Sequence, residues 1–158
     1  MVMTIQERVV NLLIEKNISI TAAESLTAGE FQSTLGQVPG VSSVFEGGFV
    51  TYSNEVKEQL LGIPKDVIDT FGVVSGETAV WMANQARSIL RKDIGISFTG
   101  AAGPDSLEGK PAGTVFIGIA LPGDKTYSRE YHFDGSRNEI RTHCVEQGLK
   151  LVLAEIEK

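Results

Sequence analysis

The sequence predicts an α/β protein: a single three-layer domain over residues 1–158, with a mixed β-sheet between helices. Three observations support this prediction. Apolar runs typical of buried strands alternate with amphipathic segments typical of helices. A hairpin pattern near the C-terminal end adds antiparallel strands. The length of 158 residues suits one domain, whose folded surface should be roughly 7,700 Å² with about two-thirds of the unfolded surface buried.

The first elements follow from capping and periodicity. Thr4 followed by Glu7 is a capping box, and it predicts a first helix that ends at Asn17. Residues 18–22 read as a short strand. The strand runs into a turn rich in small and hydroxylated residues, and a second helix is expected over residues 29–35.

The middle of the chain alternates in the same way. Residues 47–52 read as a β-strand. Asn54 is a good N-cap for a helix over residues 55–61. Pro64 suits the first turn of another short helix, and Ser75 caps a long helix after it.

The C-terminal half completes the pattern. Residues 94–99 form a strand of the buried type, and residues 100–113 hold four glycines and two prolines, which predicts a loop. Residues 115–120 and 125–133 read as two strands of a hairpin. The last helix is expected over about residues 137–156.

Composition narrows the class of protein. The net charge of −6 argues against a general nucleic-acid-binding surface, which needs clustered positive charge. Cys144 is the single cysteine, so no internal disulfide can form. With no apolar run of membrane-spanning length and no secretory signal pattern, we expect a cytoplasmic protein. His132 and His143 fall in different elements, and no cluster has metal-ligand spacing, so no metal site is expected.

Two segments contain candidate catalytic groups. Ser25 follows a strand and precedes a helix, beside free backbone N–H groups, but a serine hydroxyl needs a neighbouring base to become a nucleophile. Lys57 falls in the first turn of a helix, where the helix field lowers the pKa of an amine, and Tyr52 could hydrogen-bond that amine or relay a proton. The alternatives are that Ser25 or Thr27 only caps a helix, and that Lys57 is a solvated surface lysine and Tyr52 a strand residue.

Two further segments contain candidate binding groups. Residues 99–105 are mostly small and follow a buried strand, so the backbone there can approach a ligand closely; the alternative is a plain connection. Arg137 and Arg141 share one face at a helix start and can attract an anion. The alternative is that they form surface ion pairs, for example with Asp134 and Glu139.

Taken together, these segments resemble the C-terminal domain of the competence/damage-inducible CinA proteins, also found alone as nicotinamide-nucleotide amidase. The resemblance runs in order over nearly the whole chain. The motifs that carry it are Ala23-Glu24-Ser25-x-Thr27, Val38-Pro39-Gly40, Gly47-Gly48, Thr51-Tyr52-Ser53-Asn54-x-x-Lys57, Leu60-Leu61-Gly62, Thr99-Gly100-x-Ala102-Gly103-Pro104, Pro111-x-Gly113-Thr114-Val115 and Phe133-x-Gly135-x-Arg137-x-x-Ile140-Arg141.

The resemblance implies a cofactor-free hydrolase that converts nicotinamide mononucleotide and water into nicotinic acid mononucleotide and ammonia, in pyridine-nucleotide salvage. It implies Ser25 as the nucleophile, Lys57 as its base and Tyr52 as an assisting group, with oxyanion donors in the turn around residues 27–29. It also implies a homodimer, and an N-terminal CinA domain that these residues do not contain. The substrate-binding positions that it implies are Glu24, Thr27, Ala28, Gly29, Asn54, Thr99, Gly100, Ala102, Gly103, Arg137 and Arg141.

The chain departs from the family pattern at three places. Ala28 replaces a glycine in the turn after the serine, Gly76 replaces an acid at a helix start, and Asp105-Ser106 replaces a glycine pair in the long loop. These departures leave an alternative open: a nucleotide-binding or regulatory protein-interaction module of a competence/damage-inducible protein, with little catalysis. A third hypothesis is a metal-dependent nucleotide hydrolase that uses Glu24 and Asp105.

Overall fold

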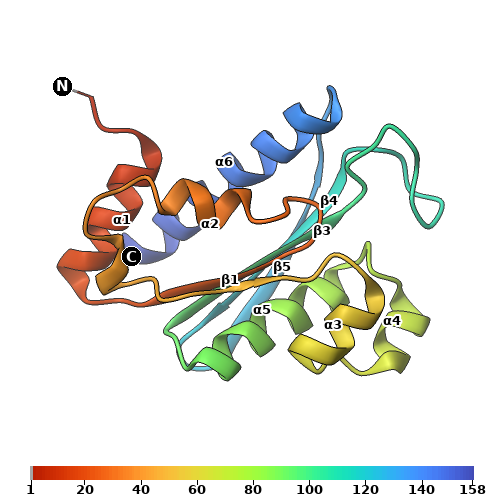
Figure 1. Ribbon diagram of the computed structural model, residues 1–158, viewed down its shortest axis with the longest axis horizontal. Coiled ribbons are helices and arrows are strands. Elements are labelled where there is room, and N and C mark those ends of the chain that lie inside the picture. The colour runs from red at the N-terminus through yellow and green to blue at the C-terminus, as the bar shows by residue number, and fades with distance from the viewer. Residues whose placement is uncertain (1) are drawn as a thin grey trace.

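A five-stranded mixed sheet organises the protein, whose computed structural model describes residues 2–158 (Figure 1). The strand order is β2-β1-β3-β4-β5. β1 pairs in parallel with both β2 and β3, whereas β4 is antiparallel to β3 and to β5. The strands are β1 (Ile20–Glu24), β2 (Phe49–Val50), β3 (Ile94–Gly100), β4 (Thr114–Leu121) and β5 (Lys125–His132).

Helices cover both faces of this sheet, which confirms the predicted three-layer α/β fold. Figure 1 shows α1, α2 and α6 on one face and α3, α4 and α5 on the other. None of these helices combines the length and the apolar composition of a membrane span. The helices are α1 (Ile5–Lys16), α2 (Glu30–Leu35), α3 (Asn54–Leu61), α4 (Lys65–Phe71), α5 (Gly76–Leu90) and α6 (Arg137–Ile156), with a 3-10 turn at Val41–Ser43.

Each face of the sheet has its own apolar cluster. The larger cluster joins the sheet to α1, α2 and α6 and includes Phe31 and Phe98, whose ring centroids lie 5.1 Å apart. The smaller cluster joins the sheet to α3, α4 and α5 and includes Ile63 and Met82. Successive residues of a strand point to opposite faces, so a strand such as β1 contributes apolar side chains to both clusters.

The predicted boundaries differ most from the observed ones at three elements, and several other elements differ by one residue. β1 begins at Ile20 instead of Ile18, and the strand expected over residues 47–52 has only two paired residues, in β2. The N-cap of α3 is Ser53, because its hydroxyl accepts the N–H of Val56 at 3.1 Å. The assignment of Asn54 as the cap is therefore wrong, and Asn54 is the first helical residue.

The direction of the strands brings the candidate residues to one edge of the sheet. β1, β2 and β3 are parallel, and two antiparallel steps make β5 run in the same direction as β3. The carboxyl ends of these four strands therefore share one edge. Ser25, Tyr52, Arg137 and residues 101–113 all follow those ends. Ligand sites in such sheets form at this edge.

Candidate active site

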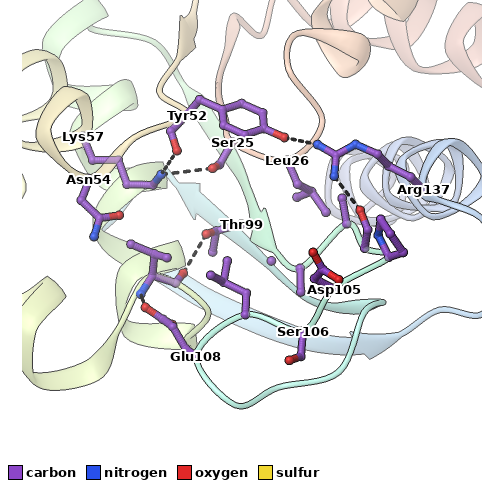
Figure 2. A pocket seen from close by; sticks show the side chains of 17 residues that line it. Ser25, Leu26, Tyr52, Asn54, Lys57, Thr99, Asp105, Ser106, Glu108 and Arg137 are labelled. Carbon is purple, nitrogen blue, oxygen red and sulfur yellow. Dashed lines mark hydrogen bonds between the residues drawn. The ribbon is translucent and has the colours of Figure 1, made fainter.

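A cavity of about 470 Å³ opens at this edge of the sheet. Its walls come from the turn after β1, the start of α3, the segment between α4 and α5, the β3–β4 loop and the start of α6 (Figure 2). Nine of the residues expected at the site line this cavity. They are Ser25, Tyr52, Asn54, Lys57, Thr99, Gly100, Ala102, Gly103 and Arg137.

Ser25 and Lys57 meet inside the cavity. The Lys57 amine lies 3.1 Å from the Ser25 hydroxyl oxygen, 2.8 Å from the Thr51 carbonyl and 3.3 Å from the Tyr52 carbonyl. Lys57 is only 1% exposed and Ser25 only 8% exposed. The interpretation of Lys57 as a solvated surface residue is therefore wrong. The two side chains form a buried hydroxyl–amine pair.

Burial sets the basicity of that amine. The pKa of Lys57 is lowered from its usual value to about 8, chiefly because burial penalises the charged form, while the negative charge of Glu108 opposes this effect. The expected direction of the shift is confirmed. The expected cause was the field of the helix, whereas the main cause is removal of the amine from water. An amine of this kind is partly neutral near neutral pH and can accept a proton.

Tyr52 contributes to the pair through its backbone. The Tyr52 side chain is half exposed, and its hydroxyl accepts a hydrogen bond from Arg137 of α6. Figure 2 shows the ring extending away from Lys57 towards Arg137. The expectation that the phenol would hydrogen-bond the amine is therefore wrong, and the contact to Lys57 comes from the Tyr52 carbonyl.

Arg137 closes one side of the cavity. Its guanidinium donates to the Gly103 carbonyl at 2.7 Å and to the hydroxyl of Tyr52. These contacts tie the start of α6 to the β3–β4 loop and to the segment before α3. Within residues 2–158 it forms no ion pair with Asp134, so the surface-pair alternative for this arginine is wrong. A fixed positive charge at the mouth of a cavity attracts anions.

Five expected binding residues do not line the cavity. Glu24 is fully buried, and its carboxylate accepts the N–H groups of Phe31 at 3.0 Å and Gln32 at 2.9 Å in the first turn of α2. Arg141 donates to the Thr27 carbonyl at 3.2 Å and lies 3.6 Å from Glu30. These groups shape the turn that holds Ser25. The five residues are Glu24, Thr27, Ala28, Gly29 and Arg141.

One N–H group of residues 27–29, where oxyanion donors are expected, is already hydrogen-bonded within the turn. The Ala28 N–H donates to the Ser25 carbonyl at 3.0 Å, so it is not a free oxyanion donor. Ala28 has a φ of 49°, in the left-handed region that favours glycine, which agrees with the expectation for an alanine at a glycine position. The Leu26 residue does line the cavity, and within the described chain its N–H donates to no protein acceptor.

Sequence reasoning missed Leu26 and Glu108 as site residues. Glu108 lines the cavity and accepts the N–H groups of Val73 at 2.9 Å and Val74 at 2.8 Å. The available signal was an acidic residue in a loop of small ones. Asp105 in the same loop carries the same signal and also lines the cavity. Only the folded chain shows that Glu108 is the one that binds the Val73 and Val74 backbone.

The metal-dependent hypothesis loses its geometric basis. Glu24 is sealed against the first turn of α2, whereas Asp105 lines the cavity, so the two carboxylates do not face a common space. Among residues 2–158 no group of three or more His, Cys, Asp or Glu side chains is arranged to hold a metal ion.

Comparisons with known proteins all lead to CinA and competence-damage inducible proteins. A model of the CinA C-terminal domain matches residues 2–156. A competence-damage inducible protein, so named, of Lactiplantibacillus plantarum is 55% identical over 91% of this chain, and one of Listeria welshimeri is 48% identical over 94%. The matches cover 34% and 36% of those relatives, so the chain spans about a third of the length of the curated relatives it matches.

Solved structures of the same superfamily have the same fold. A CinA superfamily protein of Klebsiella pneumoniae superimposes with a TM-score of 0.94 at 25% identity, covering 97% of this chain and 96% of its own. A competence/damage inducible protein of Agrobacterium tumefaciens gives a TM-score of 0.89 at 30% identity, with 100% and 99% coverage.

Proposed function

The chain belongs to the CinA C-terminal domain family, and from this premise we propose that it is a nicotinamide-nucleotide amidohydrolase with a serine nucleophile. Its reaction would convert nicotinamide mononucleotide and water into nicotinic acid mononucleotide and ammonia. The observation that carries the proposal is the 3.1 Å contact between the Ser25 hydroxyl and the buried Lys57 amine. The substrate itself comes from the family resemblance.

The neighbours of Lys57 favour its role as a base. Two of its three hydrogen-bond partners are the carbonyls of Thr51 and Tyr52, which only accept, and the third is the Ser25 hydroxyl. A neutral amine has two N–H donors and one lone pair. If the two donors bind the two carbonyls, the lone pair faces the Ser25 hydroxyl. With a pKa of about 8, roughly a tenth of the lysines are neutral at pH 7.

The proposed reaction follows from that orientation. The Ser25 oxygen attacks the carboxamide carbon, and its proton passes to Lys57. The tetrahedral intermediate then collapses: the C–N bond breaks, Lys57 gives the proton to the leaving nitrogen, and ammonia departs. The ester on Ser25 is hydrolysed by a water molecule whose proton again passes to Lys57. A final proton transfer restores the Ser25 hydroxyl and releases the acid.

Other groups of the cavity have proposed roles in binding. The free N–H of Leu26, next to the nucleophile, is the proposed donor to the oxyanion. Arg137 and the small residues of the β3–β4 loop are proposed to hold the nucleotide, with the guanidinium near its phosphate. Asn54, at the start of α3, supplies a further polar group to the wall.

The decisive experiment is ammonia release from nicotinamide mononucleotide in excess chelator. Wild type should turn over, and Ser25→Ala and Lys57→Met should each lose at least about a thousandfold in kcat/KM. Lys65→Ala removes an exposed lysine of α4 and should keep full activity. Circular dichroism of each variant checks that the fold is intact.

Two results would refute the assignment. Full activity in folded Ser25→Ala would show that Ser25 is not the nucleophile. Full activity in folded Lys57→Met would show that Lys57 is not the base. A folded wild type that binds the nucleotide without turnover would instead favour the nucleotide-binding or regulatory module. The names of the curated relatives, which state competence and damage induction and no reaction, keep that second function in view.

A further inference from the structure

Glu108 holds the β3–β4 loop against the junction between α4 and α5. Its carboxylate accepts the adjacent N–H groups of Val73 and Val74 at 2.9 and 2.8 Å. From the same loop, the Lys110 amine donates to the Val74 carbonyl. The β3–β4 loop therefore binds three backbone groups of this segment: the N–H groups of Val73 and Val74 and the carbonyl of Val74. Figure 2 shows the Glu108 side chain directed to that backbone.

The local backbone is built around this contact. Leu107 and Lys110 exchange two backbone hydrogen bonds of 2.9 Å, so residues 108 and 109 form the tip of a tight turn. Glu108 has a φ of 54°, in the left-handed region that is unfavourable for a non-glycine residue. Opposite it, a Cβ on Gly72 would lie 2.5 Å from a Glu108 carboxylate oxygen. A side chain at residue 72 would therefore displace the carboxylate.

The clamped segment is also part of the cavity wall. The Val73 carbonyl accepts the hydroxyl of Thr99 at 2.7 Å, which ties the segment to the end of β3. Val73, Thr99 and Glu108 all line the same cavity as Lys57. The loop, the α4–α5 junction and β3 thus form one connected wall, to which Glu108 contributes a carboxyl group.

The negative charge of Glu108 raises the pKa of the Lys57 amine and so opposes part of the effect of burial. The other titratable side chains in the cavity wall are Tyr52, Asp105 and Arg137, and Lys110 lies beside Glu108. The charged residues of α5, which packs against α3, are Glu77 and Arg87, and those of α3 are Glu55 and Glu58; none of these lines the cavity.

We propose that Glu108 is a positioning residue of this site: it pins the β3–β4 loop as a wall of the cavity and keeps a carboxylate in the same cavity lining as the Lys57 amine. The inference rests on the proposed function, in which Lys57 accepts the proton of Ser25. The positive charge that develops on Lys57 in that step is stabilised by the carboxylate.

The test compares Glu108→Gln, Glu108→Asp and wild type in two measurements. The first is an NMR titration of the Lys57 amine in lysine-labelled protein, assigned with Lys57→Met. The second is the pH dependence of kcat and kcat/KM with nicotinamide mononucleotide. Glu77→Gln, an exposed glutamate at the start of α5, is the matched control.

Loss of the carboxylate charge and displacement of the β3–β4 loop should shift the Lys57 titration in opposite directions. Glu108→Gln should move the Lys57 titration, and the acidic limb of kcat/KM, to lower pH, because the charge that raises the pKa of Lys57 is gone. Its kcat on the alkaline plateau should fall about tenfold. Glu108→Asp keeps the charge but is shorter, so it should raise KM and leave the titration near that of wild type.

The outcomes separate this inference from the proposed function. A Lys57 titration that is unchanged in Glu108→Gln would overturn the inference. A shift to higher pH would overturn the charge role, because that is the result expected when the loop is released and water reaches the amine; it would leave only the pinning of the loop. The titration needs no turnover, so a wild type without amidase activity would refute the proposed function while the shift to lower pH would still support the contact.

Discussion

Lys57 is held in the cavity at an electrostatic cost, because its amine is almost completely removed from water. Two backbone carbonyls and the Ser25 hydroxyl satisfy its hydrogen bonds, but no carboxylate of residues 2–158 forms an ion pair with it. The charged form is therefore disfavoured, and the pKa falls to about 8. An amine kept in this state is useful as a base and unfavourable for stability, a combination that is typical of catalytic groups.

This cost predicts a pH dependence of stability. The folded-state pKa of Lys57 is about 8 and its usual value is 10.5, so the unfolded chain binds more protons between these values. The penalty is full below pH 8 and disappears as the pH rises towards 10.5. The free energy of unfolding of wild type, minus that of Lys57→Met, should therefore rise by up to about 3 kcal/mol from pH 7 to pH 10. Urea unfolding at a series of pH values measures it, and a flat difference would contradict the assigned burial.

At the level of secondary structure, Lys57 lies in α3, and the Ser53 cap determines where α3 begins. Because the Ser53 hydroxyl caps the helix, Asn54 becomes the first helical residue, and Lys57 lies one turn in with its amine directed back to the chain before the helix. Starting the helix one residue later would rotate residue 57 by about 100° relative to Ser25.

The cap makes a specific prediction. Ser53→Ala removes the acceptor of the Val56 N–H and should lower the free energy of unfolding by about 1 kcal/mol. Asn54→Ala removes no cap and should change that free energy by less than about 0.5 kcal/mol. Urea unfolding of both variants at one pH provides the comparison. A larger loss for Asn54→Ala would restore the assignment of Asn54 as the cap.

For the whole molecule, one sheet joins two apolar clusters into a single unit. The accessible surface is 7714 Å², in agreement with the roughly 7,700 Å² expected of one folded domain of this mass. β1, β3 and β4 separate the two clusters and contribute side chains or backbone to both layers. Neither helical layer can keep its apolar face covered if the sheet is lost.

The shared sheet predicts one cooperative unfolding transition. Trp81 on α5 reports by fluorescence on one layer, whereas far-UV circular dichroism reports on all helices. The two urea curves should coincide, with equal midpoints and slopes. Separate midpoints would mean that the two layers unfold independently. The homodimer implied by the family resemblance stays a prediction.

Local patterns were enough to predict most of the architecture. Capping residues and hydrophobic periodicity depend on neighbours in the chain, so the capping box at Thr4 and the last helix, expected over residues 137–156, are confirmed. The errors fall where tertiary contacts decide. The strand expected over residues 47–52 keeps only two paired residues, Phe49 and Val50, opposite Ala23 and Glu24 of β1.

The sequence alone determined the order of the elements, the α/β class and the family, because each depends on short-range patterns or on ordered motifs. The tertiary structure decided which side chains share a cavity. It placed Ser25 and Lys57 together, turned the Tyr52 ring towards Arg137, sealed Glu24 against α2 and brought in Glu108. The physical reason is that burial and the meeting of distant segments depend on how strands and helices pack, and a linear pattern does not contain those distances.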